Sequence, residues 1–392
     1  MKKLLLIFAM GIFISCSEKA QVELDFTKDL SATGTSNCYI LYKSGDYFFD
    51  GTIKGNGKRT EGITAPLGIP VSGVKLVWET SIGMINNLSF DGINIHFNFN
   101  GTAGNALIAA TDENDDIIWS WHLWAPSEKI KTIESKNGYQ VTNLNIGALK
   151  SELSGSQNAD IYGLLFQWGR KDPFPSSPAL TGDVSTMGFT VYDAIGEPLA
   201  FEHSPWTSDA DNTLDYAIAH PTICISNYAH YSNTRDWLKE NEANSMLWAE
   251  QKTIYDPCPV GYKVPSADTF KSFTTSGGYS TIVEDFDIAD FNEDGVFDAR
   301  DFTFGWHFNM KDGCLFFPAA ARYDGSYGML MGSKAGLWGT YWANSSSPEN
   351  SSYYAGTAAV ALSFMTEKNS IAVSPSAFAS KADAYSIRCI KE

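Results

Sequence analysis

The strict alternation of apolar and polar residues in the stretch INIHFNFN, residues 93–100, constrains the fold more than any other feature. Ile93, Ile95, Phe97 and Phe99 fall on one face of an extended chain, and the Asn and His residues between them fall on the other. A helix would spread the same apolar side chains around its axis. The stretch therefore predicts a β-strand with one buried face.

Nearby stretches predict further short strands. The string CYILYKSGDYFFDGTI predicts two strands on either side of residues 44–46. The string NALIAATDENDDIIWSWHLW predicts a hairpin with its turn at residues 112–116, and Trp119, Trp121 and Leu123 share one face of the second strand. Several short strands at this spacing predict a β-sandwich.

His122 lies between tryptophans on the opposite face of the second hairpin strand. No second His, Cys or carboxylate stands beside it at the spacing of metal ligands. We therefore expect a structural histidine with no chemical role.

Family resemblance extends this interpretation. The strings TGTSNCYILYKSGDYFF, VKLVWET and GNALIAATDENDDIIWSWHLWAP, in this order, resemble a β-sandwich module that recurs in surface lipoproteins and fimbrillin-like proteins of the Bacteroidetes. We assign residues 31–125 to this β-sandwich domain.

The rest of the chain resembles a second family. The strings VTNLNIGAL, GLLFQWGRKDPFP, HPTIC, TRDWL, KTIYDPCPVGYKVPSADTF, FPAAARYDG, GTYWANS and YSIRCIKE, in this order, are similar to the Fibrobacter succinogenes major paralogous domain, which has a C-type-lectin-like fold. We assign residues 126–392 to this domain, with an insertion near residues 284–304. The expected fold class is thus mainly β in the first domain and α+β in the second.

The second resemblance also implies a disulfide. It places the cysteine of DPCP beside the cysteine of IRC, which are Cys258 and Cys389 in this chain. The alternative is a pair of buried free thiols. One departure from the family stands out, because the usual Asp-Arg-Asn run is replaced here by residues 143–145, Asn-Leu-Asn. An ion pair made by the family's Asp and Arg is therefore absent.

Residue patterns predict two helices in this half. Ser266 is a good N-cap for a short helix that would carry Phe270 and Phe273 on one side. The string TRDWLKENEANSMLW predicts the other helix. Its expected buried residues are Trp237, Leu238 and Leu247.

The N-terminus predicts the location of the protein. Two lysines precede the apolar stretch LLLIFAMGIFI and then Ser15 and Cys16, which is typical of a secretory signal peptide of residues 1–15. The string FISC followed by SEK resembles a bacterial lipoprotein signal, in which Cys16 is acylated and residues 16–30 form a linker. We expect a lipid anchor in the outer membrane, with the protein facing the cell exterior. The alternative is a soluble secreted protein.

Charge and cysteine count narrow the set of partners. The formal net charge is -17, so a phosphate backbone would be repelled and nucleic acid is not an expected partner. Of the 6 cysteines, removing Cys16 leaves an odd number, which implies a free thiol or an intermolecular pair.

The string DFNEDGVFDARD, residues 290–301, has the spacing of a calcium loop. Gly295 stands at position 6, where the loop turns sharply, and oxygen donors stand at positions 1, 3, 5, 9 and 12. The predicted ligands of one structural calcium ion are Asp290, Asn292, Asp294, Asp298 and Asp301, with the backbone carbonyl of Val296. The alternative is a solvated acidic turn.

Catalytic motifs are missing from the sequence. There is no HExxH, GxSxG or CxxC string. The string GNGKRT, residues 55–60, lacks the leading glycine of a phosphate loop and has Arg59 where a hydroxyl is needed, so it predicts a basic turn. We do not expect an enzyme, although carboxylates are numerous enough for a glycosidase pair.

An aromatic string points to ligand binding. Sugars stack their apolar faces on aromatic rings, and GLWGTYWANSSSPENSSYY offers several such rings among polar residues. The candidate ligand-binding residues are Trp338, Tyr341, Tyr353 and Tyr354. The alternative is that Trp338 and Trp342 fill the core.

Together these features predict a membrane-anchored cell-surface lipoprotein for adhesion or glycan binding. Its partners would be a glycan or a surface protein, and the lipid membrane through the acylated Cys16. The alternative is a structural accessory or tip subunit of a fimbria, with pilin subunits as partners.

Overall fold

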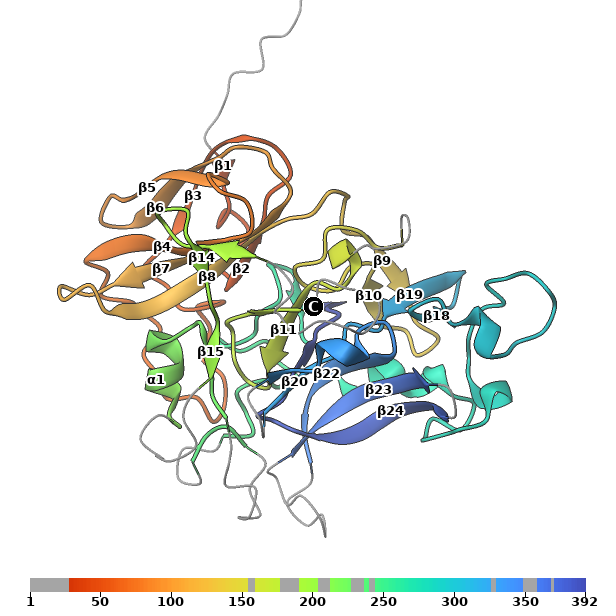
Figure 1. The fold of residues 1–392 in the computed structure, drawn as a ribbon. Helices are drawn as coiled ribbons and strands as arrows, with labels where there is room; N and C mark the ends of the chain where they lie inside the picture. Colours follow the sequence, from red (N-terminus) through yellow and green to blue (C-terminus); the bar gives the residue numbers. More distant parts are fainter. Residues whose placement is uncertain are drawn as a thin grey trace, which may run out of the picture.

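The computed structural model describes residues 28–153, 159–176, 190–203, 212–226, 236–239, 244–325, 329–347, 358–367 and 370–392 (Figure 1). The fold is mainly β and contains several separate sheets. Cys16, with the expected signal peptide, lies outside the described residues.

Two sheets form most of the first half of the chain. The four-stranded sheet has the order β1 (Lys28–Asp29), β3 (Gly45–Asp50), β6 (Asn94–Phe99) and β5 (Ile85–Phe90). The six-stranded sheet has the order β14 (Pro198–Leu199), β13 (Val191–Tyr192), β4 (Gly73–Glu79), β7 (Gly104–Thr111), β8 (Ile117–Ala125) and β2 (Cys38–Ile40). The two sheets contribute to one core, in which the Phe49 ring of β3 lies 5.2 Å from the Trp121 ring of β8.

The alternation in β6 has the expected effect. Ile95, Phe97 and Phe99 are buried, whereas the residues between them are only partly buried. Ile93 departs from the prediction, since it precedes the strand and is exposed. Its backbone N–H donates to the carboxylate of Asp91, so this residue belongs to the turn and its side chain lies outside the core.

The predicted hairpin is confirmed. Strands β7 and β8 pair antiparallel on either side of the turn at residues 112–116. Trp119, Trp121 and Leu123 are all buried. Strand β2 lies on the other side of β8 and runs parallel to it.

The second half contains a four-stranded sheet, an eight-stranded sheet and two strand pairs. One has the order β17 (Tyr262–Lys263), β26 (Ile390–Lys391), β10 (Gln140–Thr142) and β9 (Thr132–Glu134). A larger one has the order β12 (Phe174–Pro175), β11 (Leu164–Gln167), β25 (Ala384–Ser386), β22 (Trp338–Ser346), β23 (Ala358–Glu367) and β24 (Ser370–Ser380), and is joined by β20 (Tyr323–Asp324) and β21 (Met329–Leu330). Two pairs complete the set, β15 (Glu202–His203) with β16 (Ile223–Cys224) and β18 (Gly305–Asn309) with β19 (Cys314–Pro318).

Helices are short in the described residues. The α-helix is α1 (Leu214–Ala219), and the Thr213 hydroxyl caps it by accepting a hydrogen bond from the Tyr216 backbone N–H. The 3-10 helices are η1 (Ala159–Ile161), η4 (Ala267–Phe273), η5 (Val283–Asp285), η6 (Ala299–Asp301) and η7 (Gly332–Lys334).

The two predicted helices had different outcomes. Residues 267–273 form the 3-10 helix η4, and Phe270 and Phe273 are buried as expected, but Ser266 makes no capping hydrogen bond. In the other segment, the described residues 236–239 and 244–248 contain no helix. The predicted burial there is correct, since the side chains of Trp237, Leu238 and Leu247 are all buried.

The two halves of the chain interlock. Tyr192 of β13 pairs with Glu79 of β4, so a segment of the second half extends the six-stranded sheet of the first (Figure 1). The Asn37 side chain donates to the backbone carbonyls of Ile254 and Asp256. One hydrophobic core runs through both halves. The halves therefore support each other's folding.

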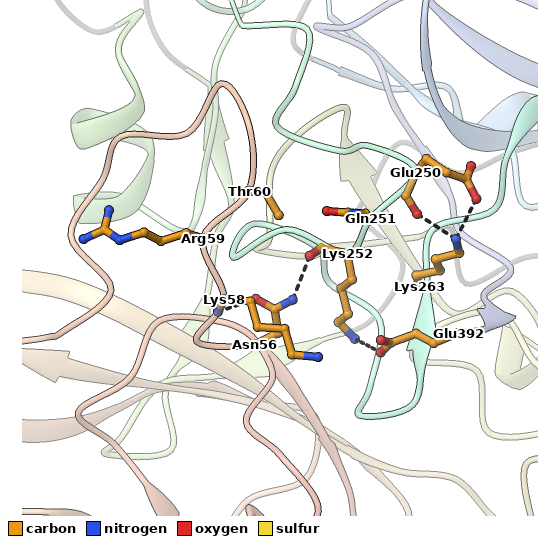
Figure 2. Close-up of a pocket in the computed structure, with 9 residues that line it drawn as sticks. All are labelled: Asn56, Lys58, Arg59, Thr60, Glu250, Gln251, Lys252, Lys263 and Glu392. Atoms are coloured by element: carbon orange, nitrogen blue, oxygen red, sulfur yellow. Dashed lines mark hydrogen bonds and ion pairs between the residues drawn. The ribbon is translucent and has the colours of Figure 1, made fainter.

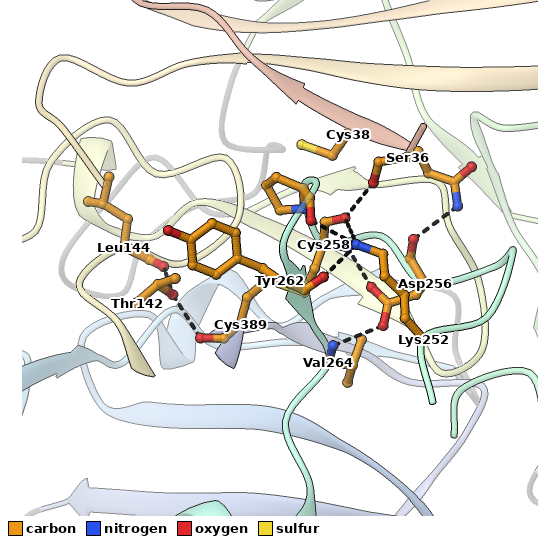
Figure 3. Close-up of a disulfide and its surroundings, with 12 residues drawn as sticks. Ser36, Cys38, Thr142, Leu144, Lys252, Asp256, Cys258, Tyr262, Val264 and Cys389 are labelled. Atoms are coloured by element: carbon orange, nitrogen blue, oxygen red, sulfur yellow. Dashed lines mark hydrogen bonds between the residues drawn. A yellow bond between two sulfur atoms is a disulfide. The ribbon is translucent and has the colours of Figure 1, made fainter. Parts of the chain in front are cut away.

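A disulfide joins Cys258 and Cys389, the pair that the resemblance implied (Figure 3). Polar contacts fix the backbone on both sides of it. The Cys258 carbonyl accepts hydrogen bonds from the Ser36 hydroxyl and from Lys252 Nζ. The Cys389 carbonyl accepts from the Thr142 hydroxyl. The bond thus ties the C-terminal strand to the junction of the two halves.

Arg388 occupies the place beside the altered Asn-Leu-Asn run. Its guanidinium is buried and donates to the Asn145 side chain at 2.7 Å, to the Asn143 carbonyl at 2.8 Å and to the Phe316 carbonyl at 2.9 Å. Amide oxygens thus accept hydrogen bonds from this buried cation. Burial lowers the pKa of Arg388 below its ordinary value.

Candidate functional site

A groove in the second half has apolar walls. The end of the acidic loop contributes Ala299, the chain after it contributes Phe302 and Phe304, and the turn after η7 contributes Leu337. Ile371 of β24 contributes to the same groove. Its volume is about 750 Å³, within the range of about 300–1,000 Å³ that is usual for small-molecule sites.

Charged residues line the same groove. Lys334 forms an ion pair with Glu367, and both residues are groove-lining. The hydrogen bond from Lys334 is the main cause that lowers the pKa of Glu367, so this carboxylate stays ionised as an acceptor. Lys334 Nζ also lies 4.6 Å from the centre of the Trp338 ring. The groove thus combines apolar walls with a few fixed polar groups.

Of the predicted ligand-binding aromatics, Trp338 is near this groove. It is half-buried, and its ring contacts Lys334 and the guanidinium of Arg322, which lies 5.5 Å from the ring centre. Its neighbour Leu337 lines the groove. Its side chain is thus partly buried, and ligand binding by Trp338 stays a prediction.

Tyr341 is removed from the candidate ligand-binding residues. Its side chain is fully buried, its hydroxyl donates to the Pro318 carbonyl, and its ring packs against Phe317. Trp342 is also fully buried, as the core interpretation expected. Tyr353 and Tyr354 lie outside the described residues.

The predicted calcium loop ends in η6 and precedes β18 in the chain (Figure 1). Gly295 adopts a left-handed backbone with a φ of 81°, which suits glycine at position 6. The Asp290 carboxylate accepts hydrogen bonds from the backbone N–H groups of Asp294 and Gly295. The carboxylate of Asp301, which is buried, accepts from those of Phe291 and Asp298. These bonds hold the ends of the loop together.

An arginine occupies the open side of this loop. Arg300 forms ion pairs with Asp294 at 2.8 Å and with Asp298 at 2.7 Å. Within the described part of the chain, no group of three or more His, Cys, Asp or Glu residues is placed to hold a metal ion. Asp294 and Asp298, two of the predicted calcium ligands, are thus partners of Arg300 in this structure.

The loop and the groove are adjacent in the chain. Asp301 ends the loop, while Ala299 and Phe302 on either side of it line the groove. The Phe302 ring also packs edge-on against Trp306 at 5.1 Å. The conformation of the loop therefore determines the position of one groove wall.

A Cys-His-Asn cluster that the sequence did not indicate lies in the first half. Cys38 Sγ lies 3.4 Å from His122 Nδ1, and His122 Nε2 lies 2.9 Å from the Asn105 side-chain oxygen. All three residues are buried. Burial raises the pKa of the thiol and lowers the pKa of His122 to about 3, so both groups stay neutral. A thiol nucleophile needs the opposite shifts and an open approach, so this cluster is structural.

Comparisons of the chain with protein-family models, with curated proteins and with solved structures find no match. Within the described ranges, none of the helices has the length and apolar character needed to cross a membrane.

The sequence did not predict the groove residues as parts of one site. They come from segments around residues 299–304, 334–337 and 366–371, of which the first overlaps the end of the predicted calcium loop and the second the start of the aromatic string. Trp338, predicted as a ligand-binding aromatic, and the predicted calcium loop both lie beside this groove.

Proposed function

We propose that this protein is a lipid-anchored outer-membrane lipoprotein at the cell surface, where it binds glycans. The N-terminal string ending in Cys16 supports the anchor. Two observations support a β-sandwich followed by a C-type-lectin-like domain. The sheets of the first half face each other across one core, and the second half combines short strands with a disulfide that joins distant segments.

The groove beside Trp338 is the observation that carries this proposal. A saccharide presents apolar C–H faces and polar hydroxyls in the same ring. The walls at Phe302, Phe304 and Leu337 suit the faces, and the Lys334–Glu367 pair suits the hydroxyls, because it offers both donors and acceptors. A purely apolar ligand would leave this pair desolvated, so a ligand with both kinds of surface is favoured.

Calcium has a structural role in this proposal. With calcium bound, Asp290, Asn292, Asp294, Asp298 and Asp301, with the Val296 carbonyl, would supply the oxygen ligands. Release of Arg300 would accompany binding, because Asp294 and Asp298 are its partners. The ion would order the loop that continues into Phe302, so its effect on the groove would be indirect.

A glycan array probed with the complete ectodomain tests the proposal. The complete chain after Cys16 is required, because β13 pairs with β4 of the first half. Specific binding to a set of related glycans would support glycan recognition. Absence of any binding, together with co-purification from the host with a polymer of pilins, would instead support a fimbrial subunit.

A further inference from the structure

A second pocket lies where the two halves of the chain meet (Figure 2). Its volume is about 390 Å³. The basic turn at residues 55–60 forms one side, and Glu250, Lys252 and Glu392 belong to the other. None of these residues belongs to the groove beside Trp338.

The basic turn is fixed against the second half. The Asn56 side chain donates to the Lys252 carbonyl at 2.7 Å and its oxygen accepts from the Lys58 backbone N–H. Gly55 has a φ of +49°, and a Cβ there would lie 2.3 Å from the Ile254 carbonyl oxygen. The turn therefore contacts the second half so closely that only glycine fits at position 55. This contact holds the backbone of the turn, and with it the Cα positions of Lys58 and Arg59, in place.

Two cations of the pocket are already compensated. Lys263 forms an ion pair with Glu250 at 2.8 Å. Lys252 is buried, donates to the carbonyls of Cys258, Pro259 and Tyr262, and lies 3.7 Å from the Glu392 carboxylate. These pairs are part of the pocket wall and leave no excess charge.

Lys58 and Arg59 are the remaining cations. Within the described ranges, neither side chain has an ion pair or hydrogen bond, and the net charge of the chain is -17, so an uncompensated basic site is unusual. Figure 2 shows Lys58 extending toward the side of Lys252 and Glu392, while Arg59 points away from them. Thr60 Oγ1, which is shielded from solvent, also lacks a hydrogen-bond partner among the described residues. The pocket lining thus has two unpaired cations, of which Lys58 extends toward Lys252 and Glu392.

We propose that this pocket binds an acidic sugar, with the carboxylate of a uronic-acid residue at Lys58 and the sugar hydroxyls at Gln251 and Glu250. A carboxylate with one charge matches one unpaired lysine. The other charges of the pocket wall are compensated and Arg59 points away, so a ligand with several charges, such as a phosphate ester, finds no second cation beside Lys58. The carboxylates of Glu250 and Glu392 accept hydrogen bonds from hydroxyls, which a simple inorganic anion lacks.

Calorimetry on the complete ectodomain tests this proposal, with glucuronic acid, glucose and inorganic sulfate as probes. Glucuronic acid should bind in a saturable and salt-sensitive manner, and more tightly than glucose or sulfate. Lys58→Gln should weaken its binding about tenfold or more, because a charge-assisted hydrogen bond is lost. Lys43→Gln, a change at another exposed lysine, should leave binding unchanged.

Several outcomes would overturn the proposal. Glucose binding as tightly as glucuronic acid would show that charge is not recognised, and sulfate binding as tightly would show a simple anion site. No saturable binding of glucuronic acid, or equal losses in the Lys58→Gln and Lys43→Gln variants, would also reject it. Ala299→Arg, which blocks the groove beside Trp338, should leave glucuronic acid binding intact, so this test is independent of the proposed glycan site.

Discussion

Cys38 and His122 are cross-strand neighbours in β2 and β8, and the Sγ atom of Cys38 lies 3.4 Å from Nδ1 of His122. The imidazole is fully enclosed, with the Asn105 side chain at its other nitrogen. This arrangement requires a neutral histidine, because a buried charge without a counter-ion is costly.

The first prediction concerns acid stability. Burial lowers the pKa of His122 from its ordinary value of 6.5 to about 3. The stabilisation of the folded state by neutral His122 is therefore fully present above pH 6.5 and is lost as the pH falls toward 3. From pH 7.5 to pH 5 this loss amounts to about 2 kcal/mol of the free energy of unfolding. His122→Gln should be less stable at pH 7.5 but should lose less stability on going to pH 5.

Urea denaturation at the two pH values measures this difference. His203→Gln, a change at an exposed histidine, serves as the control and should keep the pH dependence of the wild type. If the free energy of unfolding changes between pH 7.5 and pH 5 as much in His122→Gln as in the wild type, His122 does not take up a proton on unfolding.

The second prediction concerns the disulfide. Cys258 and Cys389 are 131 positions apart, and a link that closes a loop of this size contributes about 5 kcal/mol in the chain-entropy model. Cys258→Ser should therefore lower the thermal midpoint strongly, whereas Cys314→Ser, a change at an exposed free thiol, should not. Non-reducing peptide mapping should recover Cys258 linked to Cys389. Alkylation of the Cys258 peptide without prior reduction would contradict the pairing.

The third prediction concerns calcium. The loop lacks a glutamate at position 12, so a dissociation constant of about 10⁻⁴–10⁻³ M is expected. Arg300→Ala should bind calcium more tightly than the wild type, because the competing ion pairs with Asp294 and Asp298 are removed. The Asp290→Ala, Asp294→Ala double variant should not bind. If the wild type gives neither heat nor thermal stabilisation at millimolar calcium, the loop is only an acidic turn.

The fourth prediction concerns the anchor. The apolar stretch before Cys16 is too short to span a bilayer, so the acyl chains would supply the membrane affinity. Cys16→Ala should leave the protein soluble or unprocessed in its host. Fractionation with a carbonate wash checks this. A normally cleaved Cys16→Ala protein that stays with the membranes would rule out the lipoprotein assignment.

Local patterns predicted local structure well in this chain. The strand at residues 94–99 and the turn at residues 112–116 depend on residues that are close in sequence, so both could be predicted from the sequence. The burial of Trp237 and Leu247 was also readable, although the helix expected to contain them is missing from the described residues of that segment. Apolar character predicts burial more reliably than it predicts the backbone conformation.

Apart from the disulfide that the family resemblance implied, long-range relationships could not be predicted. The pairing of Tyr192 with Glu79 and the contact of Cys38 with His122 join segments that show no pattern in common. Tyr341 was expected at a ligand site, yet its hydroxyl and ring both fit the core, and sequence does not distinguish these uses of a tyrosine. The groove could not be predicted either, because its walls come from three segments that are far apart in the sequence.

The most direct test of glycan binding is a comparison of two variants on the best ligand from the array. Ala299→Arg places a bulky charged side chain in the groove, whereas Phe378→Ala changes an exposed aromatic that is not among the groove-lining residues. Titration of each ectodomain with that ligand should show binding abolished in Ala299→Arg and unchanged in Phe378→Ala. Wild-type affinity in a folded Ala299→Arg protein would contradict the assignment of the groove as the glycan-binding site.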